Sequence, residues 1–130
     1  MRAAVGTADG VYLVDLEDET ILPLDPATEL SAPASLELSL PRVVAAAASG
    51  STVVAVVDRR PPLMVSHDAG RTWREAGAGL PRGRAVAVAE DDPDLVLYAA
   101  RNRLYLSTDG GRFWRALTVE LPEIERVEFD

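Results

Sequence analysis

The sequence contains no cysteine, no lysine, a single histidine and no long apolar run. Without cysteine, disulfides, thiolate nucleophiles and Cys-ligated zinc or iron–sulfur sites are excluded. No segment approaches the roughly 20 apolar residues that a membrane-spanning helix needs, and residues 1–10 lack the apolar core of a secretory signal. We therefore expect a cytoplasmic protein, and the residue pattern predicts no metal and no cofactor.

Positive charge is also low relative to negative charge. The chain has 130 residues, of which 13 are basic and 21 acidic, and its net charge is −8. Nucleic acids and anionic lipids attract proteins with a positive field, so we expect neither a nucleic-acid partner nor a membrane partner. The length fits one domain with one hydrophobic core, over residues 1–130.

One short octet is written twice. SHDAGRTW at 66–73 returns as STDGGRFW at 107–114, forty-one residues later, and the dipeptide Leu-Pro follows each Trp at the same distance. A third Leu-Pro lies at 40–41. A period of about forty residues indicates a repeat architecture in which each repeat is one structural unit.

Each repeat predicts four short strands, because β-rich segments alternate with clusters of Asp, Pro, Gly and Asn. We label the four positions A to D. The predicted ranges are 43–48 and 85–90 for A, 52–58 and 95–100 for B, 63–66 and 104–107 for C, and 72–76 and 113–118 for D. The Ala-rich run 43–48 has helical propensity, but it occupies the register of strand 85–90. The predicted fold class is all-β, built from the four-stranded antiparallel blades of a β-propeller.

The octets resemble the Asp box, or bacterial neuraminidase repeat, whose pattern is Ser-x-Asp-x-Gly-x-Thr-Trp. The first octet matches it in full, and the second has Phe113 in place of Thr. The resemblance covers roughly residues 42–130 and implies a turn between the third and fourth strands of a blade, on the face away from the family's catalytic centres. The predicted structural residues are Ser66, Asp68, Gly70, Thr72, Trp73, Ser107, Asp109, Gly111 and Trp114.

The N-terminal part is interpreted as a degenerate copy of the repeat. Residues 3–7 predict strand B, and a hairpin over about 11–24 turns at 17–19 without the octet residues. Residues 25–40 interrupt the period and predict a loop insertion. The blades are then about 2–24, 42–81 and 84–121, with an extra strand at 124–129.

Three blades are too few for a closed propeller ring, which needs about four to eight. The simplest closure is a homodimer in which strand 124–129 of each chain completes the first blade of its partner, giving a six-bladed ring. A fragment of a longer propeller, an open stack of three blades and a larger ring remain alternatives.

Fold does not decide function, so the site residues must. The sialidases that share the octet use an arginine triad, a Tyr–Glu pair and a central acidic residue, and this set does not map onto the chain. We predict that Tyr12, Tyr98 and Tyr105 pack between blades and that 90–94 is a solvated turn. His67 becomes Thr108 in the second octet, which makes a metal or proton-transfer role improbable.

The basic residues are all Arg, which the base composition of a genome can explain by itself. Several nevertheless fall in the B–C and D–A loops, which share one face of a propeller, and planar guanidinium groups suit carboxylates and phosphates. We therefore expect a non-enzymatic scaffold or binding module for an acidic protein or an anionic glycan. The alternative is a glycan-active hydrolase or a remnant of one. The predicted binding face carries Arg42, Arg59, Arg60, Arg84, Arg101 and Arg103, with Arg82 beside them.

Overall fold

The structure is a computed structural model that describes residues 1–22, 40 and 42–130. The described residues form twelve strands and no helix, so the all-β prediction is confirmed. Accordingly, none of these residues belongs to a helix that could cross a membrane. The Ala-rich run, with its helical propensity, is strand β4, because it pairs with a fully buried neighbour along its whole length.

The strands form three antiparallel sheets of four strands each. Sheet II contains β4 (Val43–Ser49), β5 (Thr52–Val57), β6 (Leu63–Ser66) and β7 (Arg74–Ala76) in sequential order. Sheet III contains β8 (Ala85–Ala89), β9 (Asp92–Ala99), β10 (Arg103–Ser107) and β11 (Arg115–Glu120) in the same arrangement. Sheet I has the order β12-β1-β2-β3, from Ile124–Phe129, Arg2–Thr7, Gly10–Asp15 and Thr20–Leu22.

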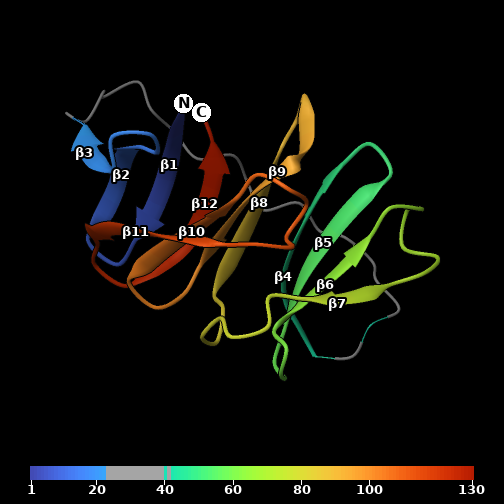
Figure 1. Ribbon diagram of the computed structural model, residues 1–130. Helices are drawn as coiled ribbons and strands as arrows, with labels where there is room; N and C mark the ends of the chain where they lie inside the picture. Colours follow the sequence, from blue (N-terminus) through green and yellow to red (C-terminus); the bar gives the residue numbers. More distant parts are fainter. Residues whose placement is uncertain (23–39, 41) are drawn as a thin grey trace.

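Strand β12 completes sheet I from within the same chain. It pairs with β1 through Ala4 opposite Glu128 and Val5 opposite Val127, and the two termini lie side by side (Figure 1). An ion pair of 2.6 Å joins Arg2 to Asp130 at this end. The prediction of a strand at 124–129 beside the first blade is confirmed, but its expected origin in a partner chain is not what the structure shows. The short reach from β11 to β12 lets one chain close the sheet.

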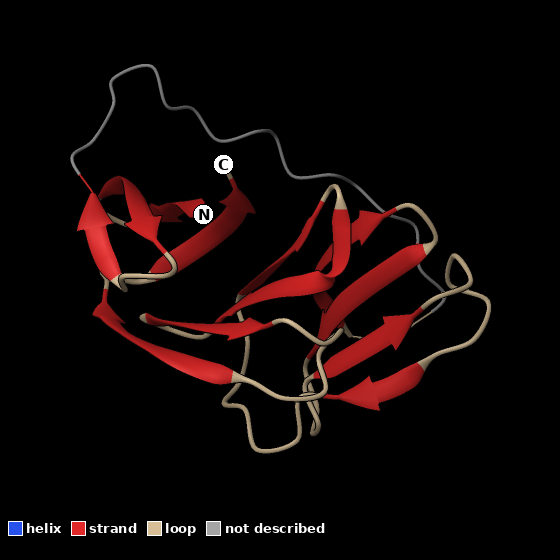
Figure 2. Cartoon of the chain, turned by 45° about the horizontal axis from the view of Figure 1, so that its top comes forward, coloured by secondary structure: helices blue, strands red, loops and turns tan. Residues whose placement is uncertain are grey.

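Sheet III lies between the other two sheets, as Figures 1 and 2 show. One apolar core joins sheet III to sheet I, with Leu97, Leu104 and Leu117 packed against Val5 and Ile124. A second core joins sheet III to sheet II through residues such as Tyr98, Val86, Val56 and Leu63. The described residues form this series of three sheets and do not close into a ring, so the sheets fit blades without forming a complete propeller.

Two boundaries differ from the sequence prediction. Strand β9 begins at Asp92, so the turn itself is only Glu90 and Asp91, while residues 90–94 are all exposed as expected. The predicted D strands begin too early, because β7 and β11 start only after the Trp of each octet, where its turn ends. The predicted insertion 25–40 lies outside the described residues apart from Leu40.

Candidate functional site

The first octet forms a hydrogen-bonded turn between β6 and β7. The hydroxyl of Ser66 donates to Asp68 Oδ1 at 2.7 Å and accepts from the backbone N–H of Gly70 at 2.8 Å. The backbone N–H of Thr72 donates to Asp68 Oδ1 at 2.8 Å, and its hydroxyl donates to Oδ2 at 2.5 Å. Gly70 has a positive φ of 87°, which glycine adopts without strain. These bonds make Asp68 the brace of the turn.

The second octet repeats this geometry between β10 and β11. Ser107 donates to Asp109 Oδ1 at 2.8 Å and accepts from Gly111 N–H at 2.9 Å. The backbone N–H of Phe113 reaches Asp109 Oδ1 at 3.0 Å. Phe113 has no hydroxyl to offer the second carboxylate oxygen, and its side chain is 78% exposed. The exchange of Thr for Phe therefore keeps the turn and removes one hydrogen bond.

Both octet carboxylates are held in the ionised form. The hydrogen bond from the Thr72 hydroxyl, followed by that from the Thr72 backbone N–H, lowers the pKa of Asp68 far below its usual value. The Phe113 N–H, then the Ser107 hydroxyl, lowers the pKa of Asp109. A general acid needs the opposite shift. The geometry of both carboxylates is therefore that of a structural brace.

Sheet I has a different brace that the sequence analysis did not find. Asp15 ends β2, and its Oδ1 accepts hydrogen bonds of 2.9 Å from the backbone N–H groups of Glu17 and Asp18. These bonds lower the pKa of Asp15, the bond from Asp18 most strongly. An Asp that bonds to the backbone two and three residues onward is a common turn former. An Asp at the end of a strand and just before a turn is the sequence signal for this brace.

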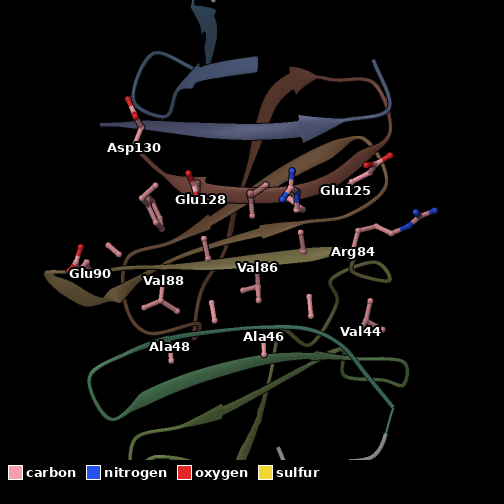
Figure 3. Close-up of a pocket in the computed structure, with 18 of the residues that line it drawn as sticks. Val44, Ala46, Ala48, Arg84, Val86, Val88, Glu90, Glu125, Glu128 and Asp130 are labelled. Atoms are coloured by element: carbon pink, nitrogen blue, oxygen red, sulfur yellow. The ribbon is translucent and has the colours of Figure 1, made fainter. Parts of the chain in front are cut away.

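A groove of about 1030 Å³ runs along the innermost strands of the three sheets (Figure 3). Strands β4, β8 and β12 supply its walls, each being the terminal strand of its sheet. The apolar part of the lining includes four alanines of β4 and three of β8. Figure 3 shows Ala46 and Ala48 facing this space from one side, with Val88 of β8 next to them.

Charges gather at the two ends of the groove. Figure 3 shows Glu90, Glu128 and Asp130 towards one end and Glu125 near Arg84 at the other, and Asp91, which follows Glu90, also belongs to the lining. With Arg126, the lining has five acidic and two basic side chains. Arg84 already binds Glu123 at 2.7 Å. The described lining is therefore negative overall, and Asp130 at the Glu90 end is already paired with Arg2 at 2.6 Å.

Of the six predicted arginines, five lie in the loops before β4, β6, β8 and β10, and Arg103 is the first residue of β10. Arg42 and Asp58 meet there through a backbone hydrogen bond, and the backbone of Arg101 binds Ile124. Arg103 pairs with Glu120 at 3.0 Å, as Arg84 pairs with Glu123. Within the described part of the chain, Arg42, Arg59, Arg60 and Arg101 have no carboxylate partner. Of the six predicted arginines, only Arg84 also lines the groove.

Two of these arginines line a small pocket on sheet II. It has a volume of about 80 Å³, and Arg59, Arg60 and Arg82 surround it together with Asp58. The Nε of Arg82 lies 3.3 Å from Asp58, and the guanidinium group of Arg59 donates to Met64 Sδ at 3.2 Å. One acidic and three basic groups leave an excess of positive charge, which suits a carboxylate or a sulfate.

The remaining candidates have structural positions. Tyr98 is fully buried, donates to the Pro81 carbonyl at 2.5 Å and contacts Tyr105 edge to face. Burial raises the pKa of Tyr98, with the nearby Tyr105 contributing. His67 is exposed, and its Nδ1 lies 3.3 Å from Thr52 Oγ1. Among the described residues, no cluster of three His, Asp or Glu side chains is placed to hold a metal.

The fold and this geometry define the class as an all-β chain of three four-stranded sheets arranged like blades. Comparison with known proteins adds no closer assignment. No family model matches the chain, and no curated protein matches it in sequence.

Proposed function

We propose that the chain is a non-enzymatic binding or assembly scaffold of the Asp-box propeller type, and that it holds an acidic group of a protein or glycan partner at its arginine-bearing end. The single observation behind this proposal is the gathering of arginines in the loops that precede β4, β6, β8 and β10. Four of them, Arg42, Arg59, Arg60 and Arg101, have no carboxylate partner within the described residues. Unpaired guanidinium groups at one end of a protein of net charge −8 give that end a distinct affinity for anions.

A binding titration with an octaglutamate peptide tests this proposal. We expect R59A/R60A to weaken binding about tenfold, because two charge-assisted contacts are lost. The matched control is R71A/R112A, which removes two exposed arginines from the octet turns at the opposite end of the sheets. Equal weakening by both double variants would show only a non-specific charge effect and would contradict the proposal.

The alternative of a glycan-active hydrolase has its own test. A hydrolase of the retaining or inverting type needs two carboxylates across a cleft from each other, and the octet carboxylates instead bind their own turns. We expect a broad panel of glycan substrates to show no turnover. Turnover that survives D68A and disappears on substitution of Arg84 or Glu125 in the groove would establish the hydrolase instead.

We further propose that two copies associate into a six-bladed ring in which each chain keeps its own β12, instead of the strand exchange expected from the sequence. The supporting feature is the N-terminal end of β4, where Val43 and Val44 are exposed by 37% and 49% and Val44 also lines the groove. In that ring β4 would adjoin β12 of the second copy, whose exposed Glu125 is charged. Inside the chain, by contrast, Ala45 and Ala47 pack on apolar residues of sheet III. We therefore expect a weak dimer.

Light scattering over a range of protein concentrations measures this association. We expect a monomer of 13.9 kDa at low concentration and a reversible shift towards the dimer at high concentration. V44E should abolish the shift, whereas T118E, on an exposed residue of β11, should not. A monodisperse monomer at every concentration would rule out the ring.

A further inference from the structure

The small pocket on sheet II lies beside the loop between β5 and β6, which is longer than its counterpart in sheet III. Between the strand residues that pair at its two ends, this loop has six residues, 57–62, whereas the loop between β9 and β10 has four, 100–103. The backbone N–H of Val57 donates to the Pro62 carbonyl at 2.8 Å, and that of Asp58 donates to the Arg42 carbonyl at 3.0 Å. These two hydrogen bonds anchor the loop that forms one wall of the pocket.

The other wall is formed by Leu80 and Arg82, from the segment that leads from β7 to β8. Leu80 packs against the core between sheets II and III. The carbonyl of Pro81 accepts a hydrogen bond of 2.5 Å from the hydroxyl of the buried Tyr98. These contacts fix the backbone that carries Arg82. Both walls are therefore held before a ligand arrives, which reduces the ordering cost of binding.

Charge distinguishes this pocket from the matching place in sheet III. Forty-one residues after Arg82, the repeat has Glu123, so the sign of the charge is reversed between the two positions. The pocket lining contains the guanidinium groups of Arg59, Arg60 and Arg82 and the carboxylate of Asp58. Three positive groups and one negative group leave a formal charge of +2. In a chain of net charge −8, this is a local site for an anion.

The guanidinium groups retain donors for a ligand. Arg82 meets Asp58 through Nε at 3.3 Å, which leaves the N–H groups of its two terminal nitrogens. Arg59 donates to the sulfur of Met64, a weak acceptor, and Arg60 has no carboxylate partner within the described residues. All three arginines are exposed, so a ligand can enter from solvent. The volume of about 80 Å³ equals that of roughly two to three waters, so the pocket admits one compact group.

We propose that this pocket binds a phosphate monoester carried by a partner, an inference that rests on the proposed function and deepens it. A phosphate monoester has a charge of about −1.5 to −2 at pH 7, which matches the +2 of the pocket. A carboxylate or a sulfate ester carries a single negative charge. The terminal oxygens of the phosphate accept paired N–H groups from planar guanidinium groups. A phosphorylated side chain and a sugar phosphate share this chemistry.

The test uses a blocked, fluorescent seven-residue peptide of Gly and Ala with a central phosphoserine. Its companions carry O-sulfoserine, Glu or Ser at that position. In fluorescence anisotropy at about pH 7.5, we expect the phosphoserine peptide to bind at least tenfold more tightly than each companion. Its affinity should fall about fourfold at about pH 5.5, because the second pKa of a phosphate ester is about 6. The sulfoserine peptide meets the same protein groups, Asp58 included, and should show no such fall.

Competition with glucose 6-phosphate distinguishes the two sources of the phosphate. Tighter binding of the peptide would assign the group to a phosphorylated protein, and tighter binding of glucose 6-phosphate would assign it to a sugar phosphate. Either result supports a phosphate site, because both ligands present the same group to the arginines.

Protein variants locate the contact. R82E should weaken binding of the phosphoserine peptide at least tenfold, whereas R112E, which changes the net charge equally at an exposed arginine of the second octet turn, should change it less than about twofold. R82K keeps the charge but loses the planar group, and it should weaken binding severalfold.

Three results would overturn the phosphate site: no binding of the phosphoserine peptide, equal binding of the sulfoserine or Glu peptide, or equal loss in R82E and R112E. Octaglutamate binding that is specifically lost in R59A/R60A would then leave the proposed function standing without this site. Loss of both kinds of binding would remove both proposals.

Discussion

The guanidinium group of Arg74 donates a hydrogen bond of 2.7 Å to the carbonyl oxygen of Gly110, joining the outermost strand of sheet II to the octet turn of sheet III. Arg115 stands forty-one residues after Arg74 and repeats the arrangement. It donates to the carbonyl oxygen of Leu16 at 3.1 Å and lies 3.6 Å from Glu19 in the turn of sheet I. Each arginine therefore ties its own sheet to the next one in the series.

The inter-sheet hydrogen bonds of Arg74 and Arg115 should contribute unequally to stability. We expect R74A to lower the free energy of unfolding by about 1.5–3 kcal/mol, because it removes a charged donor from a buried carbonyl group. R115A should lower it by about 1 kcal/mol or less, since Arg115 is exposed. Urea denaturation measures both values, with R112A as a control that should remain within about 0.5 kcal/mol of the parent. An unchanged free energy of unfolding in R74A would show that the hydrogen bond from Arg74 to Gly110 contributes no net stability.

The close contact of Gly83 with Tyr98 predicts intolerance of any side chain at Gly83. A Cβ atom there would lie 2.6 Å from Cε2 and Cζ of the Tyr98 ring and even nearer to its hydroxyl. Because Tyr98 is fully buried, its ring cannot simply move aside. We expect G83A to destabilise the fold by about 1–3 kcal/mol, the usual range for overpacking.

A double variant separates overpacking from other causes. Y98F loses the hydrogen bond to the Pro81 carbonyl, which should cost about 1 kcal/mol. It also removes the atom nearest to the added methyl group. In thermal unfolding, G83A/Y98F should therefore be less destabilised than the sum of the two single variants. Strict additivity would mean that the contact with the hydroxyl is not the cause.

The forty-one-residue spacing was sufficient to predict the strands of sheets II and III, and the recurring Leu-Pro at 40–41, 80–81 and 121–122 placed the strand at 124–129 in the register of β4 and β8. It could not predict which copy of β12 completes sheet I, since intramolecular and exchanged pairing obey the same register. The roles of Arg74 and Arg115 could not be predicted from the repeat either. Their bonds join sheets, and a repeat pattern describes each sheet alone.

The candidate site was predictable only in part. Loop assignment placed the arginines at one end of the sheets, but their pairing depends on which carboxylate of the neighbouring loop lies within reach, as Glu120 does for Arg103. The groove was not predicted. Its alanines look like ordinary strand residues in the sequence, and the space above them arises from the mutual placement of β4, β8 and β12.

The lowered pKa values of Asp68 and Asp109 predict acid sensitivity. A carboxyl group with a folded-state pKa below its unfolded value of about 4 stabilises the fold above that pH, and the stabilisation is lost as the pH falls further. The melting temperature should therefore decline below about pH 4. D68N should melt lower than the parent at pH 7 and show a shallower decline in acid. E75Q, with an exposed carboxylate outside the octets, should retain the parent profile. Parallel profiles for D68N and the parent would contradict this origin.

The two octet tryptophans differ in a way that predicts different sensitivity to substitution. Trp114 Nε1 donates to the Gly111 carbonyl at 2.9 Å, and its ring meets Tyr98 edge to face at 5.8 Å. Trp73 Nε1 is buried, and no described residue accepts a hydrogen bond from it. Replacement of Trp114 by Phe removes a satisfied donor, whereas the same change at Trp73 removes an unsatisfied one. We expect W114F to cost about 1–2 kcal/mol more than W73F. Denaturation of the two variants under identical conditions compares them directly, and equal losses would show that the hydrogen bond of Trp114 contributes no net stability.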